Sequence, residues 1–161
     1  MFTALLNGNV IDIYDYERPK VEIDKAGLTC KFCDNQLTIK HGMIREKHFA
    51  HLPNNGCAYY DLIGDIESPA HMALKRWVYN WYKAEIPEVY IEFEKILCER
   101  KRIADLYVQY PTGFEEVIEC QVSRITVEKV LDRTLCYWDY GFPLFWIFDS
   151  RLASEDFKRE I

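Results

Sequence analysis

The sequence lacks an excess of basic residues, a long apolar run, internal repeats and low-complexity tracts. Its 20 lysine and arginine residues are outnumbered by 26 aspartate and glutamate residues, which gives a formal net charge of −6. This charge excludes a uniformly basic nucleic-acid-binding coat but leaves room for local basic patches. No apolar segment approaches the ~20 residues that cross a membrane. The first 15 residues lack the basic region that begins a secretory signal, so we expect a cytoplasmic protein.

The composition favours a folded chain, because 49% of the 161 residues are hydrophobic and 15% are aromatic. A chain of this length forms one domain, or one domain with a small appendage. The composition changes near residue 60: the clustered cysteine and histidine residues lie before it, and most periodic segments lie after it. We therefore divide the chain into residues 1–60, a β-hairpin with a metal-bound ribbon, and residues 61–161, a larger domain.

Turn signals and hydrophobic periodicity predict the main elements. Asn7-Gly8 lies between two short apolar segments, which predicts a hairpin over residues 3–13. After residue 66 we predict the order α-β-β-β-α-β, a mixed α/β (α+β) sheet with helices on its faces. The predicted segments are helix 69–84, strands 89–93, 102–108 and 114–121, a helix from Thr126 to near Gly141, and strand 144–148. The second helix has an apolar stripe of Val127, Val130, Leu131, Leu135 and Trp138, and we expect all four tryptophans to lie in the core.

Cysteine and histidine residues gather between residues 30 and 57. Cys30 and Cys33 form a C-x2-C pair, a spacing that lets one tight turn supply two metal ligands. Tetrahedral zinc takes four ligands, so two of His48, His51 and Cys57 would complete the site. We prefer His51 and Cys57, because the Pro-Asn-Asn-Gly segment between them can fold back on the metal. His48 would then lie beside the site.

The competing interpretation of this cluster is a structural cysteine pair with unrelated histidines. Zinc is favoured, because five such ligands lie close together in a chain with only six cysteines and four histidines. Clustered cysteines in a reducing compartment are also more often metal ligands than disulfides. A closed four-ligand site is structural and would hold together a ribbon too small for its own core. The remaining Cys98, Cys120 and Cys136 are expected to be small core residues.

Three acidic residues stand at ordered places in the second half of the chain. Glu67 precedes the first helix, Asp105 lies inside the second strand and Glu119 lies inside the third. An acid within an apolar strand is costly unless it is paired or binds a cation. A turn at Pro111–Gly113 predicts a strand pairing that sets Asp105 across from Glu119, with an uncertainty of a residue or two.

Two carboxylates on adjacent strands, with a third from a helix, form an oxygen-rich site suited to Mg²⁺. In such a site Mg²⁺ activates water and stabilises charge on a phosphodiester. The alternative is that Asp105 and Glu119 only form ion pairs with Lys101, Arg102 or Arg124. The residues by themselves leave both interpretations open.

A series of short motifs runs in order along residues 28–148. They are Cys30-x2-Cys33, His48-Phe-Ala-His51, Glu67-Ser68-x2-His71-x3-Lys75, Arg102-x-Ala104-Asp105, Glu119-x-Gln121-x-Ser123, Arg133-Thr134-x2-Tyr137 and Trp146-Ile147. As a set they resemble the competence protein CoiA family. The resemblance implies a zinc-ribbon-like part over residues 1–60 and, over residues 61–161, a nuclease domain of the PD-(D/E)xK, restriction-endonuclease-like kind.

The resemblance also implies roles for individual residues. Asp105 and Glu119 would bind the catalytic Mg²⁺ or Mn²⁺, and Glu67 would be the helix acid. His71 and Lys75 belong to the same helix motif. Arg133 and Tyr137 stand in a helix that contacts DNA or supports the site in related folds, and Arg102 is a candidate phosphate contact.

One departure from the family pattern bears on activity: Gln121 stands where many proteins of the wider fold carry lysine. An amide cannot supply positive charge, although it can orient water, and Lys75 would then have to supply the charge. The leading hypothesis is a divalent-metal-dependent nuclease that hydrolyses single- or double-stranded DNA in DNA uptake and recombination, acting with other DNA-processing proteins. The alternative is a zinc-containing DNA-binding or protein-interaction module with a degenerate nuclease site.

Overall fold

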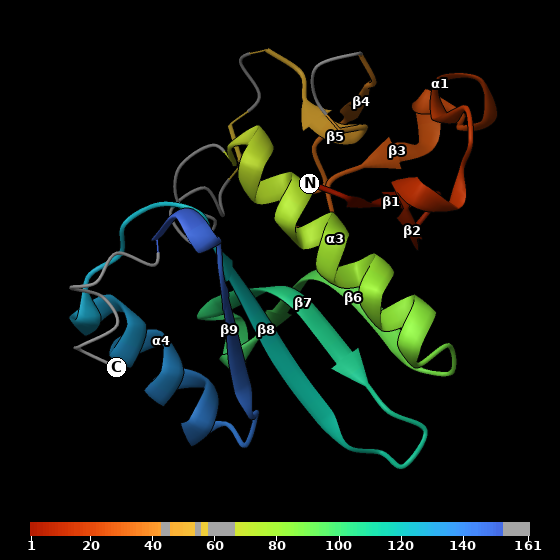
Figure 1. Ribbon diagram of the computed structural model, residues 1–161. Coiled ribbons are helices and arrows are strands. Elements are labelled where there is room, and N and C mark those ends of the chain that lie inside the picture. The colour runs from red at the N-terminus through yellow and green to blue at the C-terminus, as the bar shows by residue number, and fades with distance from the viewer. Residues whose placement is uncertain (43–45, 54–55, 58–66, 153–161) are drawn as a thin grey trace. The chain divides into compact units, whose positions relative to one another are not determined.

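The computed structural model describes residues 1–42, 46–53, 56–57 and 67–152. The chain folds into two compact units, Met1–Ile66 and Glu67–Ile161, whose elements are labelled in Figure 1. The boundary predicted at residue 60 lies outside the described residues. Among the described residues, neither long helix combines the length and the apolar composition needed to traverse a bilayer.

The N-terminal unit is built from short strands. Strands β1 (Thr3–Leu6) and β2 (Asn9–Asp12) form the predicted hairpin, whose turn residues Asn7 and Gly8 both have the positive φ that an Asn-Gly turn requires. β1 also pairs with β3 (Leu28–Thr29). A separate ribbon joins β4 (Leu37–Lys40) to β5 (His48–His51). Short helical turns lie between β2 and β3: Ile13–Asp15, α1 (Pro19–Glu22) and Lys25–Gly27.

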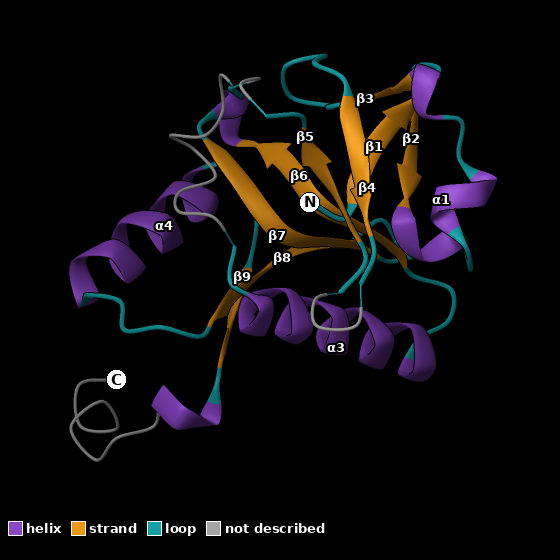
Figure 2. Ribbon diagram, turned by 90° about the horizontal axis from the view of Figure 1, so that it is seen from above, coloured by secondary structure: helices purple, strands orange, loops and turns teal. Residues whose placement is uncertain are grey.

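The C-terminal unit has mixed α+β structure in the predicted element order. Its sheet has the order β6-β7-β8-β9, antiparallel except for the parallel pair β8/β9. The elements are α3 (Pro69–Glu85), β6 (Tyr90–Leu97), β7 (Arg102–Gln109), β8 (Glu115–Gln121), α4 (Val127–Asp139) and β9 (Leu144–Phe148), with short 3-10 turns at Cys98–Arg100 and Ser150–Leu152. The two helices α3 and α4 lie on opposite faces of this sheet (Figure 2).

The register of β7 on β8 follows from the tight turn between them. Leu106 pairs with Ile118 and Tyr107 pairs with Val117, the register that the Pro111–Gly113 turn predicts. Gly113 has a φ of +85°, a conformation that other residues rarely adopt. The paired stretch ends at Leu106 and Ile118, so Asp105 and Glu119 follow at the place where the two strands part.

The expectation that the tryptophans are core residues is wrong for three of them. Trp77, Trp81 and Trp138 are exposed, the last at 72% of its surface. Trp146 is half-buried and donates its indole N–H to Thr134. The predicted stripe of α4 likewise faces outward through Val127, Leu131, Leu135 and Trp138. The reason is that α4 turns another face to the sheet, the one bearing Thr134 and Tyr137, whose hydroxyl groups bond to strand residues.

Candidate functional site

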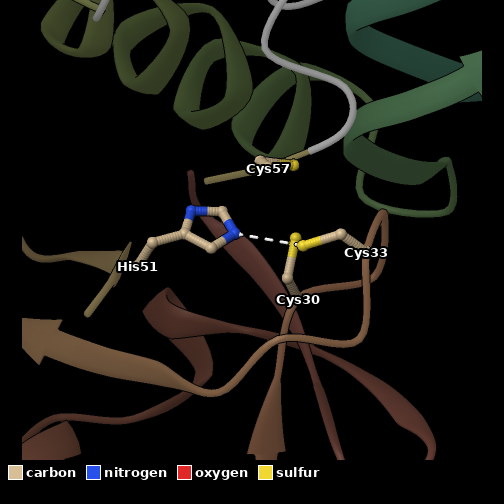
Figure 3. A group of neighbouring side chains, drawn as sticks. All are labelled: Cys30, Cys33, His51 and Cys57. Carbon is tan, nitrogen blue, oxygen red and sulfur yellow. Dashed lines mark hydrogen bonds between the residues drawn. The ribbon is translucent and has the colours of Figure 1, made fainter. Parts of the chain in front are cut away.

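Three cysteines and one histidine come together in the N-terminal unit. The ligand atoms of Cys30, Cys33, His51 and Cys57 all lie within 4.8 Å of one another. Cys33 Sγ lies 3.4 Å from His51 Nε2. Figure 3 shows the four side chains pointing toward one another. These are the four residues of the preferred sequence-based set.

Local backbone geometry explains how the first two ligands converge. The Asp34 N–H donates to the Cys30 carbonyl at 2.9 Å, and the Cys30 N–H donates to the Asn35 carbonyl at 2.8 Å. Asp34 has a φ of 59°, which closes this tight turn. Both sulfur atoms therefore come from one short loop that two backbone hydrogen bonds close, as the C-x2-C spacing predicts.

The pairing of β4 with β5 decides which histidine joins the cluster. Leu37 pairs with His51 at one end of the ribbon, and Lys40 pairs with His48 at the other. The two histidines are three residues apart on one strand, so their side chains leave opposite faces. His48 Nδ1 lies 2.7 Å from the Glu46 carbonyl oxygen instead. His51 is therefore the histidine that the structure places with the cysteines.

The donor set fits a soft divalent metal ion. Three sulfur atoms and one imidazole nitrogen are the donors of structural zinc sites, and here all four lie within 4.8 Å of one another. Burial raises the pKa of Cys30 to about 12 and lowers the pKa of His51. A metal ion bound here would therefore displace a proton from Cys30 at neutral pH.

A second cluster begins at the first turn of α3. The Ser68 hydroxyl accepts the His71 backbone N–H at 3.2 Å, and Pro69 occupies the first helical position. Glu67, His71 and Lys75 follow one another at intervals of four residues and so lie along one side of the helix entry. His71 Nε2 lies 3.0 Å from Asp105 Oδ2, and His71 Nδ1 lies 3.4 Å from Glu67 Oε1.

Lys75 is the buried cation of this cluster, with no exposed surface. Its Nζ lies 2.5 Å from Glu67 Oε1, 3.0 Å from Glu94 Oε1 and 3.7 Å from Asp105 Oδ1. Burial alone would lower the pKa of Lys75, but these three carboxylates raise it well above the ordinary value. Lys75 therefore stays charged and holds three acids together.

Asp105 lies where β7 parts from β8. Its Oδ2 accepts the Cys120 backbone N–H at 2.8 Å, so a side chain replaces the carbonyl that a regular ladder would offer. Burial alone would raise the pKa of Asp105, but His71 and Lys75 hold it below its ordinary value. The same carboxyl raises the pKa of His71 against the lowering effect of burial.

Glu119 has different partners from Asp105. It is 2% exposed, and its two oxygens accept bonds of 2.8 Å from Arg133 Nη1 and the Tyr137 hydroxyl, both on α4. Burial and the charge of Asp105 raise the pKa of Glu119 to about 7, although Arg133 opposes the shift. Side chains of α3 therefore hold Asp105 in place, and side chains of α4 hold Glu119 in place.

The described residues that could hold a metal ion in this unit are Glu67, His71 and Asp105, whose ligand atoms lie within 4.8 Å of one another. Glu119 is not in that group. Gln121 Nε2 donates to the carbonyl and the hydroxyl of Ser123, at 2.7 and 3.1 Å.

Two further residues, Arg102 and Glu94, complete the description of the site. Arg102, the candidate phosphate contact, donates to Asp132 on α4 at 2.6 Å. Glu94 is a site residue that sequence reasoning missed. It follows Ile91, Glu92 and Phe93 in apparent alternation, so the pattern assigns it to a solvent-facing row with Glu92. The pattern contained no signal for its burial, since that depends on a positive φ at Glu94 itself.

Two family models match the chain. One, described as the nuclease-like domain of competence protein CoiA, matches residues 67–160. The other, described as the N-terminal domain of competence protein CoiA, matches residues 14–60. The chain belongs to the competence protein CoiA family. Searches of curated proteins and of solved structures found no match. The second cluster therefore lies in the nuclease-like domain of a CoiA-family protein, and the cysteine cluster lies in the N-terminal part.

Proposed function

We propose that this CoiA-family protein is a divalent-metal-dependent nuclease that hydrolyses DNA phosphodiester bonds, with a restriction-endonuclease-like PD-(D/E)xK core in Glu67–Ile161. The observation that carries the proposal is the position of Asp105. Its carboxylate lies at the parting of two strands, bonded to His71, near Lys75 and beside Glu67. Perturbed acids gathered with a buried cation are typical of catalytic sites, and the nuclease-like family match points to the reaction.

The acids of the cluster outnumber its permanent cations, and this excess of negative charge favours the binding of a divalent ion. Four buried or half-buried acids (Glu67, Glu94, Asp105 and Glu119) face two permanent cations, Lys75 and Arg133. Glu67, His71 and Asp105 would hold the ion, with Glu119 nearby on β8. A bound Mg²⁺ or Mn²⁺ would supply Lewis acidity toward a phosphoryl oxygen and a water of lowered pKa.

The protein's own side chains would then divide the remaining tasks. Lys75 supplies fixed positive charge at the site, because Gln121 is uncharged and its amide is bonded to Ser123. His71 orients Asp105 through its 3.0 Å contact. Arg133 and Tyr137 anchor Glu119 from α4, near enough to Asp105 for the charge of Asp105 to raise the pKa of Glu119.

For the N-terminal unit we propose a structural zinc ion on Cys30, Cys33, His51 and Cys57. The closed four-ligand donor set leaves no open position for substrate. For the whole protein we propose DNA as the substrate, DNA uptake and recombination as the setting, other DNA-processing proteins as partners, and the cytoplasm as its location. The CoiA family match supports this setting.

A second candidate function is a zinc-containing DNA-binding or protein-interaction module with a degenerate nuclease site. The observation that favours it is Gln121, which carries no charge and turns to Ser123. The net charge of −6 also weakens electrostatic attraction to DNA.

The test is cleavage of labelled single- and double-stranded DNA with Mg²⁺ or Mn²⁺. Asp105→Asn keeps the side chain's shape but removes its charge, and we expect it to lower the rate by about 10³-fold or more, since a metal site contributes several kcal/mol to the transition state. Asp139→Asn, which changes an exposed acid at the end of α4, is the matched control and should cut normally. DNA binding without cutting under either metal would support the second candidate and overturn the first.

A further inference from the structure

Two successive side chains of β6 contact the same helix. The Phe93 ring stacks on Tyr79 of α3, with ring centroids 4.8 Å apart. The next residue, Glu94, accepts a hydrogen bond from Lys75 of α3 at 3.0 Å. Successive residues of a regular strand point to opposite faces of the sheet. A regular β6 would therefore direct Glu94 away from Lys75.

The backbone conformation of Glu94 accounts for this departure. Its φ is 54°, in the left-handed region that a glutamate inside a strand rarely adopts. Phe93 pairs with Leu106, and Lys95 pairs with Ala104, so the β6/β7 ladder is in register on both sides. The pair that would lie between them, Glu94 with Asp105, is missing from the ladder. Strained conformations of this kind persist where the surrounding structure holds them, and they concentrate at functional sites.

Glu94 lies beside the candidate metal ligands without being one of the group. The residue is 6% exposed, so its carboxylate is withdrawn from solvent. Among the described residues, the ligand atoms that converge are those of Glu67, His71 and Asp105. Lys75 contacts Glu67 and Asp105 as well as Glu94. Of the three described acids that contact Lys75, Glu67 and Asp105 belong to this candidate metal group and Glu94 does not.

We propose that Glu94 is a positioning residue for Lys75: it holds the buried ammonium at the site and leaves Glu67 and Asp105 available to a divalent cation. This inference rests on the proposed nuclease function. It explains how a CoiA-family chain with Gln121 on β8 keeps a fixed positive charge near Asp105. The cation comes from α3, and the strained residue on β6 keeps it in place.

The decisive variant is Glu94→Gln, which removes the charge and keeps the length of the side chain. We expect kcat for DNA cleavage to fall by about 10²-fold with KM for DNA unchanged, because a small displacement of a catalytic charge has an effect of this size. Glu92→Gln is the matched control: it is the same substitution two residues earlier, on a side chain that faces Lys95 and Tyr90, and it should cut normally.

Two additional arms separate positioning from a merely structural role. Glu94→Asp keeps the charge and should restore part of kcat, and it also provides a folded variant if Glu94→Gln fails to fold. The ¹H–¹⁵N signal of the Lys75 ammonium in the metal-free protein should shift or broaden in Glu94→Gln and stay in place in Glu92→Gln. This readout does not depend on cleavage.

The outcomes are distinguishable. A loss of kcat together with a displaced Lys75 signal supports the inference. Unchanged kcat in a folded Glu94→Gln protein overturns the inference and leaves the nuclease proposal intact. If the unaltered protein cuts no DNA with Mg²⁺ or Mn²⁺, the nuclease proposal fails and the catalytic role of Glu94 fails with it. A Lys75 signal that still moves would then report only a buried ion pair.

Discussion

The two side-chain clusters of this CoiA-family protein differ in how their charges are balanced. The cysteine cluster brings together Cys30, Cys33, His51 and Cys57, and none of the four is a lysine or an arginine. In the acid cluster, by contrast, Lys75 and Arg133 already neutralise part of the charge of the carboxylates. On the proposed zinc assignment, the first cluster would need an external ion to hold its ligands together. The second cluster has cations of its own, so the proposed catalytic metal would not be needed for folding.

The largest expected effect is the loss of zinc from the first cluster. Cys33→Ser should remove the metal and unfold Met1–Ile66, because structural zinc contributes on the order of 10 kcal/mol to domains of this kind. All four tryptophans lie in Glu67–Ile161. Tryptophan emission should therefore stay native while far-ultraviolet circular dichroism and metal content fall. Cys136→Ser, outside the cluster, should keep its zinc, and a metal-free Cys33→Ser protein with native dichroism would contradict the zinc assignment.

Thiol alkylation at pH 8 compares the cysteines of the first cluster with Cys98 of the C-terminal unit. A chelator should expose Cys30, Cys33 and Cys57 to alkylation, because unfolded thiols have ordinary pKa values near 8.5. Burial raises the pKa of Cys98 to about 12, so only about one molecule in 10⁴ carries its thiolate at pH 8. Peptide mass spectrometry should show that Cys98 reacts more than about 10³-fold more slowly than the three cluster cysteines. Its alkylation rate should rise tenfold per pH unit below pH 11. Equal rates would show that chelation unfolds both units.

Removing the internal cation tests the second cluster. Lys75→Met removes the positive charge that Glu67, Glu94 and Asp105 share, and we expect the metal-free protein to lose about 3–5 kcal/mol of unfolding free energy. Urea unfolding followed by tryptophan emission measures this loss. Lys83→Met, two turns later on α3, removes a bond to the Val89 carbonyl and a contact with the Tyr79 ring, and it should cost about 1 kcal/mol. Mn²⁺ should stabilise both variants by binding the folded state, and it should stabilise Lys75→Met more than Lys83→Met because it also offsets the missing positive charge.

The smallest effect is expected at Trp138, a residue that the sequence pattern assigned to the core. Because it is 72% exposed, Trp138→Ser should change the unfolding free energy by only about 0.5 kcal/mol. A loss of several kcal/mol in the same urea experiment would show that the outer face of α4 is covered in solution.

Much of the fold could be predicted because its signals are local. The Asn7-Gly8 turn determines the first hairpin, and the turn at Gly113 determines the β7/β8 register. The element order after residue 66 also follows from the periodicity. The orientation of α4 could not be predicted, because a polar face bearing Thr134 and Tyr137 turned toward the sheet although the apolar stripe was the stronger pattern.

The sequence by itself determined which residue types were available for each cluster: the C-x2-C turn, the two histidines of β5, and the acids Glu67, Asp105 and Glu119. Spacing along the chain suffices for the two cysteines of the C-x2-C turn and the histidines of β5, because they belong to one turn or one strand. The tertiary structure placed His51, the histidine that the sequence already favoured, with the cysteines through the pairing of β5 with β4. It also added Glu94, through a single positive φ. Both choices depend on which face of a strand meets its neighbour, and that is decided by long-range packing.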